Sequence, residues 1–317
     1  MCTAILLNEY AGRNLDIEKS YGESLIITPR NYTLPFRKAE KISEHLAFIG
    51  IGITSRGYPL YYDAVNEDGL YIAGLNYVGN AKYHAPKNDR VNLAPYEFIP
   101  YLLSKCRSIK EARNELSKIN LINIPFSDEL PCAELHFFIA DKKDAITVEP
   151  DANGMNIYDN DIGVLTNNPS FPIQLHNLNN YAGLSSKPIV NRYPKKIQFN
   201  EYSRGMGALG LPGDLSSESR FVRAAFHKLN HVSTDKVTDI FHLLTTVAMP
   251  NGSLDLGDNF YERTEYTSAA NLNTLTYYYR TYESGAILSA GLFNENLDSP
   301  SLISYPLVSV SDVKSHN

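Results

Sequence analysis

The chain has 317 residues, of which 43% are hydrophobic, and this is enough to bury a large core. The formal net charge of -6 excludes a general affinity for nucleic acid, because phosphate binding needs clustered Lys and Arg. The 19 Gly and 17 Pro are spread along the chain instead of being gathered into a linker. We therefore expect one domain over residues 1–317.

The first residues contain no basic stretch followed by a long apolar one, so they predict neither a signal peptide nor a membrane anchor. The three cysteines, Cys2, Cys106 and Cys132, are odd in number and far apart, which favours free thiols in a reducing compartment. A cytoplasmic protein without membrane insertion is expected. No CxxC pair or HExxH helix occurs, so the sequence indicates no metal site, and no cofactor is implied.

Short β-rich runs separated by turn residues dominate the first third of the chain. They predict strands at residues 2–7, 10–16, 24–30, 46–54, 59–66 and 70–77. Helical spacing of apolar residues follows at 95–106 and 109–119, and Ser108 with Glu111 matches a capping box ahead of the second helix.

The rest of the chain also places strands and helices in blocks. The predicted elements are strands at 135–140, 145–149, 156–158 and 163–166, helices at 172–180, 217–230 and 235–247, and strands at 266–272, 274–282, 286–292 and 303–308. Blocks of this kind, rather than strict alternation, favour antiparallel sheets with helices on their outer faces. The predicted fold class is therefore α+β, as a sandwich.

Cys2 is the residue whose chemistry stands out. Its side chain is small, so we expect methionine aminopeptidase to remove Met1 and leave Cys2 as the N-terminal residue. The thiol then shares a residue with an α-amine, whose ordinary pKa of ~7.7–8.0 lets it act as a general base at neutral pH without a histidine. A cysteine near an N-terminus is otherwise a small buried residue, and the residues alone leave both interpretations open.

Arg13 is a candidate for the positive charge that favours a thiolate. If Leu7 and Asn8 form the two-residue loop of a hairpin, Cys2 pairs with Arg13 and both side chains lie on one face of the sheet. The guanidinium would then stabilise the thiolate and lower the pKa of the amine. Asp16, three residues further on, is expected to accept a hydrogen bond from the amine.

A series of short motifs runs in order over nearly the whole chain. They are MCT at 1–3, GRNLD at 12–16, ITPRNY at 27–32, YYDAVNE at 61–67, AGLNY at 73–77, GVLTNNP at 163–169, ALGLPGD at 208–214, SRF at 219–221 and YYYRTY at 277–282. Together they resemble the choloylglycine hydrolases, which include bile salt hydrolases and penicillin V acylases and belong to the N-terminal nucleophile hydrolases. The resemblance implies a four-layer αββα sandwich of two antiparallel sheets.

The resemblance also implies hydrolysis of an amide by an N-terminal cysteine, through a thioester acyl-enzyme. Its catalytic residues would be Cys2, Arg13, Asp16, Asn76, Asn167 and Arg220. The two asparagines would shape the oxyanion hole, because amide N–H groups donate to a developing oxyanion and do not lose their protons by titration. On the residues alone, each asparagine is more often a turn residue.

Asn76 favours conjugated bile salts as the small-molecule substrate. Relatives that resemble bile salt hydrolases tend to have asparagine in this Gly-Leu-Asn motif, whereas penicillin V acylases often have tyrosine. Penicillin V acylase, or another N-acyl amidase, is the alternative. A sterol body needs an apolar cleft, and by similarity it would be formed by Leu15, Phe126 and Leu130, with Tyr58 and Tyr62 near its rim; each of these is otherwise a core residue.

Two features depart from the family. The first hairpin, at residues 5–12, is several residues shorter than is usual there. The chain also has no tryptophan, and His136-Phe137-Phe138 stands where a His-Trp pair is common, which leaves the shape of the pocket open. Relatives often form tetramers through an excursion near residues 185–199, so we expect a homotetramer.

Two further functions stay open on the sequence. A cysteine hydrolase could use Cys106 or Cys132 with one of the 8 histidines, although neither cysteine has a recognisable local motif. A non-catalytic protein could bind bile salts or another amphipathic ligand in the same cleft. Retention of Met1 would favour this last function, because the amine of Cys2 would then be blocked as an amide.

Overall fold

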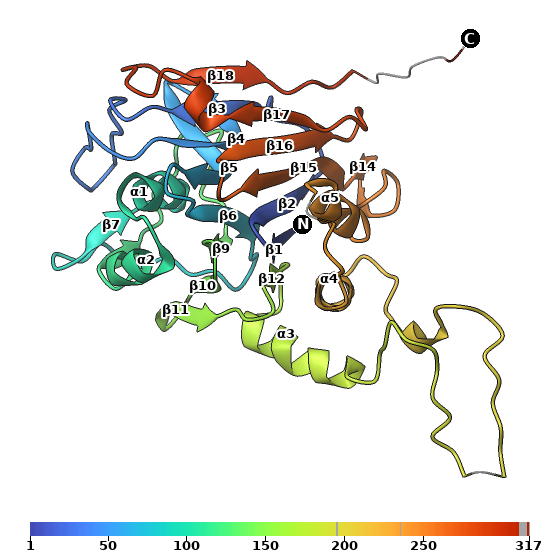
Figure 1. The fold of residues 1–317 in the computed structure, drawn as a ribbon. Helices are drawn as coiled ribbons and strands as arrows, with labels where there is room; N and C mark the ends of the chain where they lie inside the picture. The colour runs from blue at the N-terminus through green and yellow to red at the C-terminus, as the bar shows by residue number, and fades with distance from the viewer. Residues whose placement is uncertain (195, 235, 311–315, 317) are drawn as a thin grey trace.

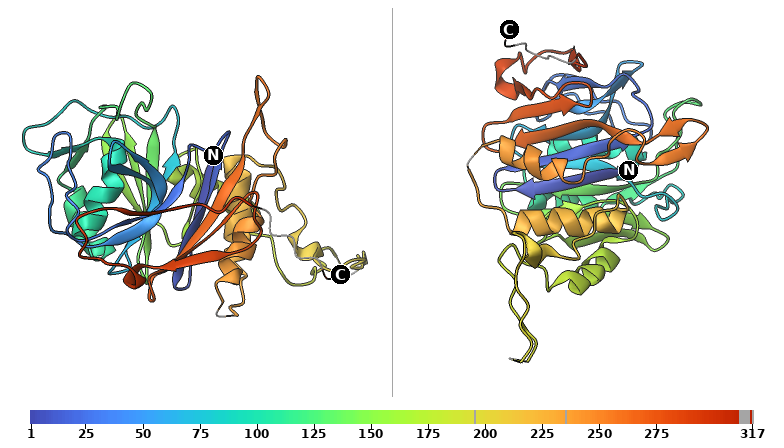
Figure 2. Two further views of the ribbon diagram at one scale, coloured as in Figure 1. Left: turned by 90° about the horizontal axis from the view of Figure 1, so that it is seen from above. Right: turned by 90° about the vertical axis from the view of Figure 1, so that its right-hand side faces the viewer.

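The computed structural model describes residues 1–194, 196–234, 236–310 and 316. Two large antiparallel sheets lie face to face, and helices cover the outer face of each sheet (Figure 1). The view from above in Figure 2 shows the resulting order of layers, which is helices, sheet, sheet and helices. The predicted α+β sandwich is confirmed.

The first sheet places the beginning of the chain beside its end. Within the described residues its strand order is β12, β1, β2, β15, β16, β17. The bounds are β1 (Cys2–Leu7), β2 (Tyr10–Ile17), β12 (Val164–Leu165), β15 (Arg263–Asn271), β16 (Thr276–Thr281) and β17 (Leu288–Gly291). Every residue of β1 is buried, which explains why this strand is a nearly continuous apolar run instead of an alternating one.

The second sheet contains most of the strands from the first half of the chain. Its strand order is β11, β10, β9, β6, β5, β4, β3, β18. The bounds are β3 (Ser24–Thr28), β4 (Phe48–Ser55), β5 (Tyr58–Asn66), β6 (Tyr71–Asn76), β9 (Leu135–Ala140), β10 (Ala145–Asp151), β11 (Gly154–Asp159) and β18 (Ile303–Pro306).

Two apolar clusters form the core, one beneath the helices on the second sheet and one that runs from between the sheets to the helices on the first sheet. The short helix η1 (Pro95–Glu97) leads into α1 (Phe98–Lys105), which packs with α2 (Ile109–Leu116) on the second sheet. On the first sheet lie α4 (Ser217–Leu229) and α5 (Thr238–Thr245), with α3 (Phe171–Leu178) against α4. The shorter helices η2 (Asn179–Tyr181), η3 (Met206–Ala208) and η4 (Leu292–Asn294) lie in the connections.

The structure differs from the predicted elements in three places. The helix predicted at 109–119 ends at Leu116, because β8 (Ile119–Leu121) pairs in parallel with β7 (Val91–Leu93). A small hairpin of β13 (Asp255–Gly257) and β14 (Phe260–Tyr261) was not predicted. Residue 235, where the sequence places the start of a helix, lies outside the described residues, and α5 begins at Thr238.

The capping box ahead of α2 is half formed. The Ser108 side chain accepts a hydrogen bond from the backbone N–H of Glu111 at 3.3 Å, as a helix N-cap should. The Glu111 carboxylate accepts from the backbone N–H of Arg107 at 2.8 Å, one residue before the expected donor.

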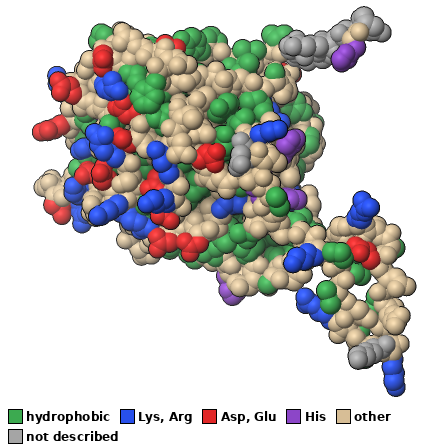
Figure 3. All heavy atoms as spheres, viewed as in Figure 1, with side chains coloured by type: hydrophobic (Ala, Val, Ile, Leu, Met, Phe, Trp, Pro, Cys, Tyr) green, Lys and Arg blue, Asp and Glu red, His purple; other side chains and the backbone are tan. Residues whose placement is uncertain are grey.

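The connection between α3 and α4 projects from the sandwich as a long arm (Figure 1), and Figure 3 shows the same segment standing clear of the body. The arm carries large apolar side chains that are exposed, namely Val190, Tyr193, Ile197, Phe199, Tyr202 and Leu209. Scattered apolar residues are common on a surface, but a cluster on a projecting segment is typical of an interaction site.

Candidate active site

The hairpin that carries Cys2 turns at Asn8 and Glu9, one residue later than predicted. Cys2 therefore lies opposite Leu15, and the predicted pairing with Arg13 is wrong. The turn forms here because Asn8 adopts a left-handed φ of 52°, which asparagine tolerates well. The resulting shift is two residues, so Arg13 keeps the same face of the sheet as Cys2 and approaches it diagonally.

Arg13 is fully buried beside Cys2. Its Nη1 donates to the carbonyl oxygens of Tyr62 at 3.0 Å and Gly74 at 2.7 Å, and its Nη2 donates to Sγ of Cys2. Burial alone would lower the pKa of Arg13, but its interaction with Cys2, and after that with Tyr266 and Asp63, raises the pKa by more. The guanidinium is therefore a fixed positive charge in contact with the sulfur.

A β-bulge turns the carbonyl of Tyr62 toward this guanidinium. In the pairing of β4 with β5, Ile51 lies opposite Asp63 and Gly52 lies opposite Tyr61, so Tyr62 is the extra residue. Its carbonyl is thereby released from the ladder and accepts from the arginine, while its ring lines the cavity described below.

The backbone nitrogen of Cys2 is held by Asn167 and Arg220. It donates to Oδ1 of Asn167 at 2.8 Å, and Nη2 of Arg220 donates to the same oxygen at 2.7 Å. Nη1 of Arg220 donates to the Cys2 carbonyl and to Thr3 Oγ1, both at 2.6 Å. Nδ2 of Asn167 donates to the Asn76 carbonyl at 2.7 Å. These bonds fix the Asn167 carboxamide with its oxygen toward the nitrogen of Cys2.

The turn that bears Asn167 is itself anchored from three sides. The Asn167 N–H donates to Ser217 Oγ at 2.8 Å, and Gln174 Nε2 donates to the Asn167 carbonyl at 2.6 Å. His136, which precedes the phenylalanine that stands where the family commonly has tryptophan, lies with Nε2 2.9 Å from the carbonyl of Thr166. The ring of His136 therefore supports the backbone next to the site despite the missing tryptophan.

Asp16 lies close to Met1, and its two carboxylate oxygens differ in their hydrogen bonding. Its Oδ1 accepts from Thr264 Oγ1 at 2.6 Å, while Oδ2 is buried and, within the described residues, has no hydrogen-bond partner. Burial raises the pKa of Asp16, and the positive charge of Arg220 opposes this shift. The Met1 amine donates to the Asp16 carbonyl at 2.6 Å and pairs with Glu262, and burial lowers its pKa.

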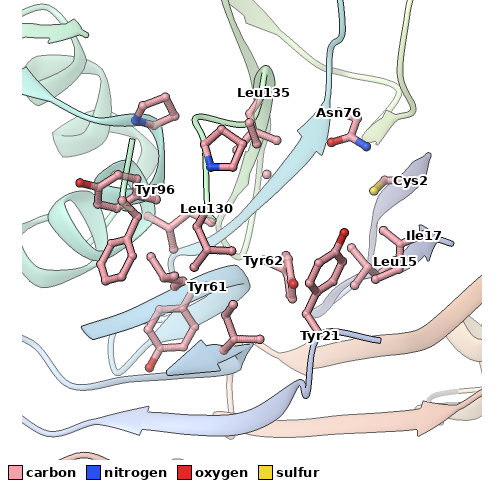
Figure 4. A pocket seen from close by; sticks show the side chains of 18 of the residues that line it. Cys2, Leu15, Ile17, Tyr21, Tyr61, Tyr62, Asn76, Tyr96, Leu130 and Leu135 are labelled. Atoms are coloured by element: carbon pink, nitrogen blue, oxygen red, sulfur yellow. The ribbon is translucent and has the colours of Figure 1, made fainter. Parts of the chain in front are cut away.

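Cys2 opens onto a cavity of about 340 Å³ between the edge of the sheets and η1–α1. Figure 4 shows the thiol at one end of the cavity with the side chain of Asn76 beside it. The walls are largely apolar and aromatic. Four of the predicted substrate-binding residues line this cavity, namely Leu15, Tyr62, Phe126 and Leu130.

Tyr58 is the exception among the predicted pocket residues. It does not line the cavity but packs behind it, with its ring 6.1 Å from Tyr96 and 6.0 Å from Phe126. The prediction missed several lining residues, namely Ile17, Tyr21, Tyr61, Tyr96, Ile99 and Leu135. Ile17 could have been found, since it lies two residues after Leu15 and so faces the same side of β2.

The two other cysteines occupy surroundings that suppress thiolate formation. Burial raises the pKa of Cys106 to about 12 and that of Cys132 to about 11. Neither thiol has an arginine in contact with its sulfur in the part of the chain that the structure describes. These surroundings disfavour the alternative hypothesis that Cys106 or Cys132 is the nucleophile.

No group of three or more His, Cys, Asp or Glu side chains that could hold a metal occurs among the described residues. In the same residues, no helix has both the length and the apolar character needed to cross a bilayer.

Sequence comparison relates nearly the whole chain to one family. A family model described as linear amide C–N hydrolases, choloylglycine hydrolase family, matches residues 2–305. A bile salt hydrolase/transferase from Lactiplantibacillus plantarum is 50% identical over 314 residues, 97% of each chain. A conjugated bile acid hydrolase from Lactobacillus gasseri is 38% identical over 318 residues, covering 96% of this chain and 100% of the relative.

Comparison with solved structures agrees. A variant of the conjugated bile acid hydrolase from Clostridium perfringens has a TM-score of 0.93 at 32% identity, with 100% of both chains covered. A penicillin V acylase from Agrobacterium tumefaciens has a TM-score of 0.75 at 18% identity, covering 98% of this chain and 92% of that one. At this identity the second likeness concerns the fold alone.

Proposed function

Since the chain belongs to the choloylglycine hydrolase family of linear amide C–N hydrolases, we propose that it hydrolyses glycine- and taurine-conjugated bile salts with Cys2 as N-terminal nucleophile. The observation that carries the proposal is the position of Cys2. Its sulfur lies between the guanidinium of Arg13 and an apolar cavity, so one thiol has both a group that stabilises its anion and room for an acyl chain.

Removal of Met1 would create the general base. The nitrogen of Cys2 becomes an α-amine that already faces Oδ1 of Asn167, and the unpaired Oδ2 of Asp16 is the acceptor we propose for a second proton. Burial lowers the pKa of the Met1 amine by more than the nearby Cys2 and Asp16 raise it, and Arg220 and Arg13 add to the lowering. The same surroundings would keep the Cys2 amine neutral, and therefore basic, near neutral pH.

Acylation then needs one proton to move and two bonds to change. The amine takes the thiol proton while the sulfur attacks the carbonyl carbon of the substrate amide, and the carbonyl oxygen becomes an oxyanion. As the C–N bond breaks, the amine returns the proton to the departing glycine or taurine nitrogen. The acyl group is left on Cys2 as a thioester.

Asn76 is the side chain that we assign to the oxyanion. Its carboxamide lies beside the thiol in Figure 4, whereas Nδ2 of Asn167 already donates to the Asn76 carbonyl. Asn167 can add its second Nδ2 proton to the same hole. A preorganised donor of this kind lowers the barrier of acyl transfer by ~3–4 kcal/mol.

Deacylation reverses the roles of the same groups. The amine of Cys2 removes a proton from water, and the resulting hydroxide equivalent attacks the thioester carbon. The sulfur leaves and takes that proton from the amine to become the thiol again, and the bile acid departs as a carboxylic acid that gives its remaining proton to solvent. No base other than the α-amine of Cys2 is needed. Cys2 alone therefore supplies both the nucleophile and the base of the cycle.

The cavity supports a steroid as the acyl part. Its apolar and aromatic walls, including Leu15, Tyr62, Phe126 and Leu130, suit a rigid hydrocarbon skeleton. The relatives named as bile salt or conjugated bile acid hydrolases point in the same direction.

The test is release of glycine from glycocholate and taurine from taurocholate, on protein whose N-terminus has been checked by intact mass. A matched control carries a tag fused ahead of Met1, which keeps the Cys2 nitrogen as an amide. We expect rapid release only from the processed chain. Equal release from the tagged chain would contradict the amine as base, and binding without release from the processed chain would favour the non-catalytic alternative.

Penicillin V is the second substrate to test, because the fold is shared with a penicillin V acylase. Release of phenoxyacetate should be slower than release from bile salts, owing to asparagine at position 76. Release from penicillin V alone would reverse the assignment of substrate.

We also propose that the chain forms a homotetramer through the projecting arm. The support is the cluster of exposed apolar side chains on the arm, among them Tyr193, Phe199 and Tyr202. Analytical ultracentrifugation of the wild type beside a variant with these three residues changed to serine tests the proposal. The variant should sediment as a smaller assembly than the wild type while keeping its secondary structure.

A further inference from the structure

Asp63 is a fully buried carboxylate that the proposed mechanism does not use. It lies on β5 between the two sheets, and hydroxyl groups from three other strands converge on it. Its Oδ1 accepts from Tyr266 at 2.7 Å, and its Oδ2 accepts from Tyr277 at 2.5 Å, Ser268 at 3.0 Å and Tyr71 at 3.1 Å.

This arrangement fits an ionised carboxylate. A carboxylate has acceptor sites for four donors, whereas a protonated carboxyl must itself donate and would leave one hydroxyl without an acceptor. Burial raises the pKa of Asp63, and the positive charge of Arg13 and the hydroxyl donors act against that shift. The hydroxyls thus take the place of the water that the carboxylate lost on folding.

Asp63 is also coupled to the guanidinium that touches Cys2. Its charge raises the pKa of Arg13, and the residue before it, Tyr62, supplies a carbonyl to Nη1 of Arg13 at 3.0 Å. The hydroxyl bonds of Asp63 fix this bulged part of β5 against β15 and β16, so the carbonyl of Tyr62 is fixed as well.

The buried charges near the thiol balance one another. The negative charge of Asp63 acts on Arg13, and that of Asp16, near the end of β2, acts on Arg220. The other titratable and charged groups around Arg13 and Asp63, within the described residues, come from both sheets, from α4 and from Met1. They are Cys2 on β1, Asp16 on β2, Tyr62 on β5, Tyr71 on β6, Tyr266 on β15, Tyr277 on β16, Arg220 on α4 and the Met1 amine.

We propose that Asp63 is a positioning residue that sets the reactivity of the Cys2 sulfur through Arg13. The proposal rests on the proposed role of Cys2 as nucleophile. Without a counter-charge, Arg13 would bind the thiolate so tightly that it forms at lower pH and attacks more slowly, because nucleophilicity falls together with thiol basicity. The charge of Asp63 offsets part of the charge of the guanidinium and so keeps the sulfur reactive.

The test measures alkylation of Cys2 by iodoacetamide against pH, followed by the mass of the N-terminal peptide. In Asp63→Asn the midpoint of the profile should move to lower pH by about one unit, and the plateau rate should fall about threefold. Tyr71→Phe is the matched control, since it removes a hydroxyl bond but no charge, and its midpoint should stay close to that of the wild type. Asp63→Glu should restore the wild-type midpoint.

A folded Asp63→Asn protein with an unchanged midpoint would overturn the proposal and leave Asp63 as a structural residue. If Asp63→Asn does not fold, thermal midpoints of Arg13→Gln and of the double variant Arg13→Gln/Asp63→Asn decide the matter. The double variant should fold and melt above both single variants, because it leaves no unpaired buried charge. A double variant no more stable than either single change would overturn the coupling.

Failure of this inference is distinct from failure of the proposed function. The alkylation profile needs no substrate, whereas hydrolysis is read from amino-acid release. A bile salt hydrolase with a charge-independent alkylation profile would refute only the role of Asp63.

Discussion

The space between the two sheets and the space beneath α1 and α2 are equally dry but hold opposite chemistry. Between the sheets lie the buried charges of Arg13, Asp63 and Asp16, tied together by hydroxyl and backbone groups. Beneath α1 and α2 the buried cluster is apolar, and the polar side chain of Asn66 within it donates to the carbonyls of Leu103 and Cys106. Each space contains one buried cysteine, Cys2 at 2% exposure and Cys106 at 1%.

Burial by itself does not make a cysteine thiol reactive. Both sulfurs are removed from water to the same degree, yet only Cys2 has a guanidinium against it, while burial raises the pKa of Cys106 to about 12. A buried thiol is inert unless the structure also buries a charge beside it, and that charge needs a partner of its own. We therefore expect the charged groups between the sheets, the inner layer, to serve the proposed chemistry, and the cluster beneath α1 and α2, the outer layer, to contribute stability.

Removing each sulfur in turn tests the difference between the two buried cysteines and should give the largest effect. Cys2→Ala should fold and bind substrate but lose turnover by ~10⁴-fold or more, because nucleophile and proton acceptor act as one unit. Cys106→Ala should keep turnover and lose about 1 kcal/mol of stability. Amino-acid release and thermal unfolding measure the two effects, and near-normal turnover by Cys2→Ala would sink the mechanism.

A second change tests whether the inner layer stabilises charge that develops during the reaction. Asn76→Ala should lower kcat by about 10²–10³-fold, with a small change in KM and in the thermal midpoint. Steady-state kinetics on glycocholate measure the split. A rise in KM with unchanged kcat would instead make Asn76 a residue for binding the ground state.

A third change tests the outer layer alone. Leu102 on α1 is fully buried and does not line the cavity. Leu102→Ala should cost about 2–5 kcal/mol of unfolding free energy because it leaves a void, while turnover per folded molecule stays unchanged. Urea unfolding and activity at low temperature are the readouts; a parallel fall in kcat would show that the two layers are coupled.

The smallest effect concerns alkaline pH. The pKa of Cys106 is about 12 in the folded chain and ~8.5 in an unfolded one, so the folded state holds the proton more tightly. The stability from this neutral thiol is complete below pH ~8.5 and is lost as the pH rises toward 12. Between pH 8 and 10 the wild type should lose about 1–2 kcal/mol more than Cys106→Ala, as measured by urea unfolding at each pH. Equal losses would contradict the raised pKa.

The sequence predicted the layers better than the residues that meet between them. Apolar runs and turn residues identify most strands, and the motif around Arg13 places it on the face of Cys2. The exact register depended on the left-handed conformation of Asn8, which no pattern of apolar residues encodes. Asp63 went unnoticed because its hydroxyl partners other than Tyr71 lie on strands more than 200 residues further along the chain, such as that of Tyr266 at a separation of 203 residues.

The central place of the first hairpin has a consequence for the order of folding. β1 and β2 leave the ribosome long before β15, the strand that pairs with the other edge of β2 and ends at Asn271. Translation must therefore reach β15 before the hairpin can be enclosed, and pairing over so long a loop makes folding slow. Until β15 is made, that strand cannot cover the hairpin that carries Cys2, so we expect removal of Met1 to precede assembly of the first sheet.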